Sequence, residues 1–252
     1  MARYVLLNNV DHHDLRVATH FGAAFGDAVG MVPTYPTEWA EVQREYPIFL
    51  RRDSEGQWQS VALLGFEATE NLFLRGDRWN ADYLPGHVAR GPFLIGFQHQ
   101  QVEGEERRVP VIHVDLDHPR LGAGQGEAVF LPHGGQSPYL DHVVKVLRGI
   151  RDGIDASKAM FAAFDALGLI QPVEVEVKFD AEQGAKLTGL SGIDRQRLAE
   201  LDAEALHGLH RQGYLEGLYL LLASAHNVRR LLAEKQRRLR DAAGSSATGQ
   251  AA

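Results

Sequence analysis

The segment VIHVDLDHP, residues 111–119, contains residue types that bind transition metals. A strand points every second side chain to the same side, so His113 and Asp115 would face one way. That spacing begins the two-histidine, one-carboxylate triad of iron(II) oxygenases, and His133 is the third ligand this interpretation would use. However, His133 lies in LPHGGQSP, which is typical of a turn. We favour the simpler interpretation, in which Asp115 ends a strand and caps the next turn.

The other polar motifs lack the partners that a catalytic or metal site needs. In DHHD, residues 11–14, neighbouring side chains diverge on a strand or a helix, so they cannot easily share one ion. His207 and His210 share a helix face, but no HExxH motif accompanies them. No serine stands in a GxSxG motif. We therefore expect a non-enzymatic protein without a cofactor, whereas the oxygenase alternative would need Fe(II).

Aromatic residues are densest between positions 46 and 97. Most of these rings must lie in the core, because each buries a large apolar area. Trp79 and Tyr83 stand in the polar context GDRWNADYLPG, which suits a ligand pocket as well as the core. The candidate binding residues are Trp58, Trp79, Tyr83 and Phe97. A pocket of this kind would take a peptide, a glycan or a protein partner.

The composition excludes several classes of protein. A formal net charge of -7 and a pI near 5.9 disfavour nucleic-acid binding. The chain has no cysteine, which removes disulfides, thiolate nucleophiles and cysteine-based metal sites. It has neither a secretory signal core nor an apolar run of the roughly 18 residues that a spanning helix needs. We expect a soluble, cytoplasmic protein with no membrane span, and the composition indicates no oligomeric state.

The first half of the chain is typical of a β-rich segment with small helical insertions. YPIFLRR and QWQSVALLGF flank the turn residues DSEG, which predicts a hairpin. Further strand candidates are RYVLLN, NLFL, PFLIGF, VPVIHVDL and EAVFL. Between RYVLLN and YPIFLRR, Thr37 fits the N-cap of a short helix.

The second half predicts helices around a C-terminal hairpin. Ser137 and Pro138 suit the start of the first of two central helices, and the second would end at Gly168. PVEVEVKFD alternates apolar and polar residues, which predicts a strand with one solvated face, and AKLTGL is the return strand. Asp194 and Asp202 fit the N-caps of closing helices. These patterns predict one α+β domain over residues 1–240 and a disordered tail over 241–252.

Several longer segments of the chain are similar to a known family. They are YPIFLRRDSEGQWQSVALLGFEATENLFL, GPFLIGF, GLIQPVEVEV, LTGLSGIDRQRLAEL, LHRQGYL and LLASAHNVRRL, in this order. In these segments the chain resembles the SapC family of bacterial proteins, whose molecular activity is not established. The segments follow in order from residue 46 to residue 231, so the resemblance extends over nearly the whole chain.

The resemblance implies more about the fold than about the function. It implies an accessory role linked to the cell surface or to TonB-dependent receptors, in the uptake of a peptide or a glycan. A component of surface-layer assembly is a further alternative. The family favours an acidic residue near Asp115 but no histidine matching His113, which weighs against the oxygenase interpretation.

Overall fold

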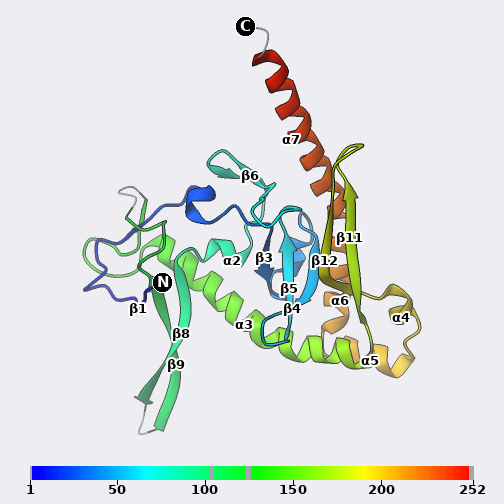
Figure 1. The fold of residues 1–252 in the computed structure, drawn as a ribbon. Helices are drawn as coiled ribbons and strands as arrows, with labels where there is room; N and C mark the ends of the chain where they lie inside the picture. The colour runs from blue at the N-terminus through cyan, green and yellow to red at the C-terminus, as the bar shows by residue number, and fades with distance from the viewer. Residues whose placement is uncertain (1, 103–104, 123–125, 250–252) are drawn as a thin grey trace.

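Five antiparallel strands form the largest sheet of the protein, shown in a computed structural model that describes residues 2–102, 105–122 and 126–249 (Figure 1). The strands are β3 (Met31–Thr34), β4 (Ile48–Arg52), β5 (Trp58–Leu63), β11 (Ile170–Lys178) and β12 (Gly184–Ile193). Their order across the sheet is β11-β12-β4-β5-β3. Helices accompany this sheet, so the predicted α+β class is confirmed.

The hairpin predicted around DSEG joins β4 to β5. Asp53 Oδ1 accepts the backbone N–H groups of Glu55 and Gln57 at 2.9 and 2.8 Å, which closes the turn. Gly56 has a φ of 78°, a left-handed conformation that glycine adopts without strain. The strand register pairs Arg52 with Trp58, so their side chains emerge together at the end of the hairpin.

A second sheet contains β1 (Tyr4–Leu6), β9 (Glu105–Asp115) and β8 (Phe93–Val102), in that order. The β8–β9 hairpin projects away from the rest of the chain (Figure 1). Two smaller strand pairs are β2 (Arg16–Val17) with β10 (Glu127–Ala128), and β6 (Leu74–Arg75) with β7 (Arg78–Trp79). The short helical insertions are η1 (Ala23–Phe25), α1 (Trp39–Val42) and α2 (Gly86–Ala89). The predicted cap at Thr37 is wrong, because its hydroxyl donates to the Gly149 carbonyl at 2.9 Å and Glu38 precedes α1.

One continuous helix, α3 (Pro138–Ala166), replaces the predicted central pair. It begins as expected, with the Ser137 hydroxyl accepting the Leu140 N–H at 3.1 Å and Pro138 in the first turn. Gly153 lies in the middle of this helix and does not end it. The glycine is needed there for close packing. A Cβ there would lie 2.5 Å from Tyr35 Cβ and 2.7 Å from Thr37 Oγ1. The glycine therefore lets the segment before α1 approach the helix instead of ending it.

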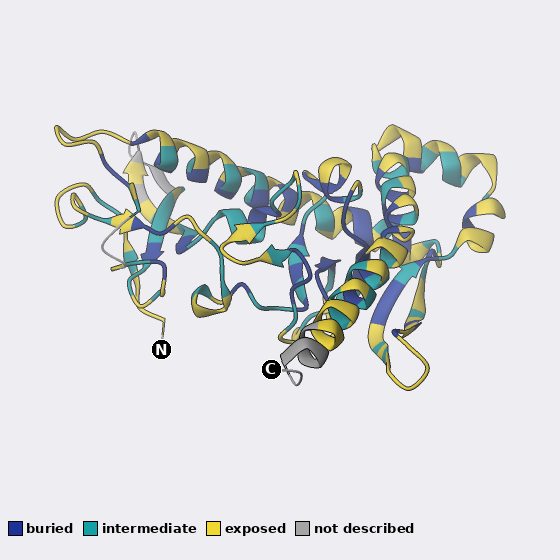
Figure 2. Cartoon of the chain, turned by 90° about the horizontal axis from the view of Figure 1, so that it is seen from above, coloured by how far each residue is buried: buried dark blue, intermediate teal, exposed yellow. Residues whose placement is uncertain are grey.

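Two buried clusters form the core, and α3 contributes to both. Leu140, Val143 and Leu147 pack with the second sheet, whereas Met160, Phe161 and Phe164 pack with the five-stranded sheet. Buried residues in Figure 2 accordingly follow one face of the long helix and the central strands. Because one rigid element joins both clusters, it positions the surfaces on either side of it.

The C-terminal part packs closing helices against the main sheet. They are α4 (Arg195–Ala199), α5 (Ala203–Arg211), α6 (Tyr214–Ser224) and α7 (Asn227–Gly249). The predicted N-caps are confirmed: Asp194 accepts the N–H groups of Gln196 and Arg197, and Asp202 accepts that of Ala205. Residues 241–249 of the predicted disordered tail continue α7, and residues 250–252 lie outside the described part. The single domain over residues 1–240 stays a prediction.

Candidate functional site

A groove of about 560 Å³ runs between the β4–β5 hairpin and the C-terminal half of α3. We call it the Trp58 groove. The hairpin supplies Arg52, Asp53, Glu55, Gln57, Trp58 and Gln59, and α3 supplies Ile154, Ser157, Lys158, Phe161 and Asp165. Its size lies within the range of about 300–1,000 Å³ that is typical of small-ligand sites. It combines an aromatic ring with many hydrogen-bonding groups.

Contacts from both walls of the groove hold the Trp58 indole in place. Its Nε1–H donates to Asp165 Oδ1 at 3.2 Å, and the Arg52 guanidinium carbon lies 3.8 Å from the centre of the ring. A cation over an indole face is an attractive contact. Arg52 also lies 3.5 Å from Asp165 Oδ2. The side chain is therefore ordered before any ligand arrives, which lowers the entropy cost of binding.

Both signs of charge line the Trp58 groove. Arg52 and Lys158 contribute cations, and the carboxylates are Asp53, Glu55 and Asp165. Gln57, Gln59 and Ser157 add neutral donors and acceptors. Ile154, 40% exposed, adds an apolar patch on the helix side. This lining suits a polar ligand with an apolar or ring-shaped part more than a strongly charged one.

Trp79 and Tyr83 lie together, but away from the groove, in a chain of hydrogen bonds inside the protein. Trp79 Nε1–H donates to the Tyr46 hydroxyl at 2.7 Å, and that hydroxyl donates to the Tyr83 carbonyl at 2.5 Å. The Tyr83 hydroxyl donates to Glu38 Oε2 at 2.9 Å. Burial raises the pKa of both tyrosine hydroxyls, so they stay protonated donors. Both candidates pack against the larger core.

Two carboxylates that sequence reasoning missed organise this region. Glu38 accepts hydrogen bonds from the Thr34 hydroxyl and the Gly86 N–H at 2.8 and 2.7 Å, besides that of Tyr83. Glu45 Oε1 accepts the backbone N–H groups of Asp82 and Tyr83. The sequence gives no signal for either residue, since their partners lie up to 48 positions away.

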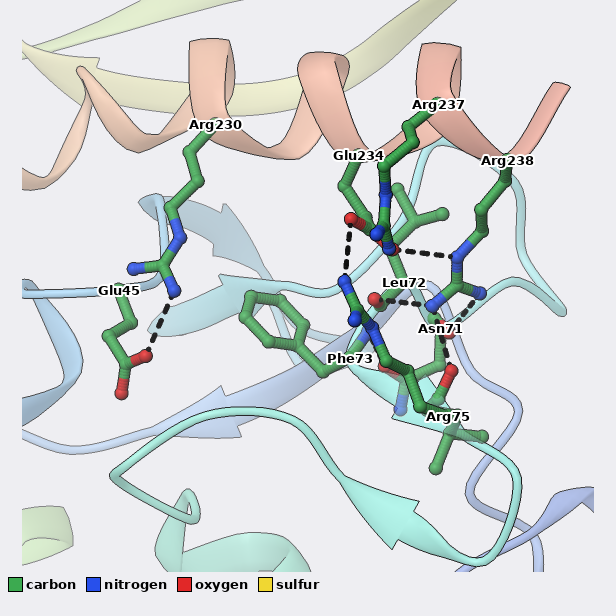
Figure 3. A network of polar contacts seen from close by, with 10 residues as sticks. Glu45, Asn71, Leu72, Phe73, Arg75, Arg230, Glu234, Arg237 and Arg238 are labelled. Atoms are coloured by element: carbon green, nitrogen blue, oxygen red, sulfur yellow. Dashed lines mark hydrogen bonds and ion pairs between the residues drawn. The ribbon is translucent and has the colours of Figure 1, made fainter. Parts of the chain in front are cut away.

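Helix α7 fixes the same region from the other side (Figure 3). Arg230 pairs with Glu45 at 3.2 Å. Glu234 accepts hydrogen bonds from Arg75, Arg237 and Arg238. Arg238 reaches over to the carbonyls of Leu72 and Leu74, at 2.7 Å each. These contacts tie the loop before Trp79 to the helix, so Trp79 belongs to a structural network.

The structure places Phe97 on a different sheet from the other candidates. It lies on β8, opposite Pro110 of β9, in the hairpin that projects from the body (Figure 1). Its side chain is 40% exposed. The four candidates therefore divide among three places: Trp58 in the groove, Trp79 with Tyr83 in the core, and Phe97 on the projecting hairpin.

The residues of the metal alternative do not form a ligand set. The His113 ring covers Gly96, where a Cβ would lie 2.2 Å from His113 Nδ1. Asp115 Oδ1 accepts the backbone N–H groups of Arg3 and Asp117 at 2.9 and 3.1 Å, as a strand-end cap does. His133 lies in the turn before α3. Across residues 2–102, 105–122 and 126–249, no cluster of three or more histidine, aspartate or glutamate side chains is arranged to hold a metal ion.

Comparison with known proteins decides the family. A family model described as SapC matches residues 7–231 of the 252-residue chain. The chain belongs to the SapC family. This confirms the resemblance carried by the long sequence segments. A search of curated proteins and a search of solved structures each returned no match. None of the helices among the described residues of this SapC protein is long and apolar enough to cross a membrane.

Proposed function

We propose that this SapC protein is a non-enzymatic accessory protein that binds a polar segment of a peptide or a glycan in the Trp58 groove. The observation that carries the proposal is the fixed Trp58 indole, held by Asp165 and Arg52 beside a groove of about 560 Å³. A tryptophan supplies a large contact area at small entropy cost, which is why it is enriched among residues that dominate binding energy.

The groove lining supports binding rather than catalysis. Its two serine hydroxyls donate to backbone carbonyls and not to a base: Ser157 to that of Ile154 at 2.8 Å and Ser60 to that of Thr34 at 2.6 Å. The Thr34 hydroxyl donates to Glu38 Oε1, but Thr34 is only 2% exposed. Nucleophilic catalysis needs a base within hydrogen-bond reach of the nucleophile. The carboxylate Asp165 is engaged by the Trp58 indole and by Arg52. These side chains orient one another and leave the rest of the lining for a ligand.

The biological setting comes from the family and forms part of the proposal. An accessory role linked to the cell surface, or to uptake associated with a TonB-dependent receptor, requires recognition of a peptide or glycan without chemical change. A groove with both charge signs and neutral amides suits such a partner, because complementary polar contacts give specificity. The cytoplasmic location expected from the sequence belongs to the same proposal.

The test is to probe peptide arrays and glycan arrays with labelled protein. We expect the wild-type protein to retain a small set of related ligands and the Trp58→Ala variant to bind them at least about tenfold more weakly, as loss of a central aromatic contact predicts. Phe97→Ala is the matched control, since it removes a partly exposed ring on another sheet. Equal binding by wild type and Trp58→Ala, or loss in Phe97→Ala alone, would contradict the proposal.

A further inference from the structure

A second cavity, of about 210 Å³, lies where three segments of the chain meet. These segments are residues 25–33, the end of α2 at residues 87–91, and the turn at residues 118–120. We call it the Arg90 cavity. It is too small for a peptide or an oligosaccharide and holds a molecule of only a few heavy atoms. It shares neither Trp58 nor Asp165 with the Trp58 groove.

One of the two arginines in the Arg90 cavity is already neutralised. Arg120 Nη2 donates to both carboxylate oxygens of Asp27 at 2.8 Å, and the two side chains are 6% and 7% exposed. Its Nη1 donates to the carbonyls of Ala18 and His20. A buried bidentate pair of this kind contributes no net charge. Arg120 and Asp27 therefore form the wall of the cavity.

Arg90 differs, because its charge is not balanced by a carboxylate. Its Nη1 donates to the Phe93 carbonyl at 2.9 Å. Within the described ranges, no aspartate or glutamate lies at ion-pair distance from its guanidinium. Burial lowers the pKa of Arg90, which reflects the cost of removing this cation from water. Arg90 is half-buried and lines a cavity of about 210 Å³, so a small anion can reach its guanidinium there and pair with it.

Two histidines supply the cavity with neutral groups. His118 Nδ1 accepts the backbone N–H of Arg120 at 3.1 Å, so the neutral ring carries its proton on Nε2 and can donate there. Burial, and next Arg120, lower the pKa of His118, and burial lowers that of His87 to about 4. At neutral pH the lining therefore carries one net positive charge, that of Arg90.

We infer that the Arg90 cavity binds a small carboxylate, with the Arg90 guanidinium as its counter-ion and a histidine N–H as a further donor. A planar guanidinium matches the two oxygens of a carboxylate in a bidentate pair. One net positive charge favours a monoanion over a dianion. This site is independent of the Trp58 groove, so either can fail without the other.

Calorimetric titration of the full-length protein with acetate and with acetamide tests this inference. The two probes have nearly the same size and shape, but only acetate carries a charge. We expect acetate to bind and acetamide to show at least about tenfold weaker binding, because removal of the charge removes the contact to Arg90. Inorganic phosphate at equal ionic strength should bind more weakly than acetate. Equal binding of acetate and acetamide, or tighter binding of phosphate, would overturn the inference.

Substitutions locate the binding. Arg90→Gln should abolish the heat released on acetate binding. Arg211→Gln, which removes an exposed arginine of α5, should leave that heat unchanged. Trp58→Ala should also leave it unchanged. Acetate binding that survives in a folded Arg90→Gln variant would place the anion elsewhere and refute the assignment. If Arg90→Gln does not fold, Arg90→Lys replaces it: lysine keeps the charge but not the planar guanidinium, so acetate should bind at least about tenfold more weakly, and unchanged binding would refute the assignment.

Discussion

At the scale of single residues, the pair of Asp27 and Arg120 is the most buried ion pair among the described residues. Replacement of Asp27 by Asn would leave the Arg120 cation buried without a counter-charge. We expect this to lower the free energy of unfolding by about 3–5 kcal/mol. Urea denaturation measures the change.

Asp117→Asn is the control for this prediction. It removes the partner of Arg3 from an exposed pair 3.7 Å long, whose side chains are 66% and 49% exposed. Exposed pairs contribute about 1 kcal/mol or less, so the control should change little. Similar effects for the two variants would mean that water reaches Arg120.

The lowered pKa of His87 should make the free energy of unfolding depend on pH. Burial lowers its pKa to about 4, whereas an unfolded histidine titrates near 6.5. The unfolded chain therefore takes up this proton at a higher pH than the folded chain does. The contribution of His87 to stability is fully present above pH 6.5 and is lost as the pH falls toward 4. The gap between the two pKa values corresponds to about 3 kcal/mol at most.

Urea denaturation of wild type and His87→Gln at pH 7.5 and pH 4.5 checks this prediction. Glutamine does not titrate, so the variant should lose about 2–3 kcal/mol less than wild type between these two pH values. The contribution of His118, whose pKa is also lowered by burial, is common to both proteins and cancels. Equal losses in the two proteins would show that protonation of His87 costs nothing in the folded state.

The residues of the Trp58 groove show what sequence reasoning could and could not find. Trp58 was among the candidates, but the sequence grouped it with Trp79 and Tyr83 because they are close along the chain. In the structure Trp58 instead contacts Asp165, 107 positions away. Such a pairing depends on how α3 crosses the sheet, and no local pattern encodes it. The burial of Glu38 and Glu45 could not be predicted for the same reason, since they bind residues that are distant along the chain.

At the scale of elements, local signals predicted most starts and turns correctly. Ser137, Asp194 and Asp202 cap helices as expected, and DSEG forms its hairpin, since each of these depends on a few adjacent residues. The prediction of two central helices was wrong because the middle of α3 has no break in the helix. Glycine lowers helix propensity by only about 1 kcal/mol, which the packing on either side of Gly153 outweighs.

The two glycines in the middle of α3 should respond in opposite ways to alanine. Gly153→Ala places a Cβ within 2.5 Å of Tyr35 and should destabilise the protein by about 1–3 kcal/mol. At Gly149 a Cβ meets nothing within 4 Å, so Gly149→Ala should stabilise by about 0.5–1 kcal/mol. Thermal and urea denaturation compare the two. The same sign of change for both variants would contradict the close approach of Tyr35 to α3.

At the scale of the whole molecule, α3 should make the two cores unfold together. The buried tryptophan Trp39 belongs to the larger core, and Trp58 and Trp79 pack against it, so tryptophan fluorescence reports on that core alone. Circular dichroism reports on the whole chain. We expect the two signals to show one midpoint in urea.

A substitution in the smaller core sharpens this prediction. Val143→Ala removes a buried side chain from that core and should shift the fluorescence midpoint to lower urea as well. Its cost should be about 1–3 kcal/mol. Separate transitions, or a fluorescence midpoint unchanged by Val143→Ala, would mean that the two cores are independent units and that the predicted single domain is wrong.

If ligands bind beside Trp58, the indole N–H signals of the protein must show it. The chain has three tryptophans, and their indole N–H groups have different partners: Ser60 for Trp39, Asp165 for Trp58 and the Tyr46 hydroxyl for Trp79. Two-dimensional NMR of ¹⁵N-labelled protein, titrated with the peptides or glycans retained on the arrays, follows all three signals at once. We predict that the Trp58 signal moves in proportion to occupancy while those of Trp39 and Trp79 stay in place. Movement of the Trp79 signal without that of Trp58 would place the site in the Tyr46 network and contradict binding in the Trp58 groove.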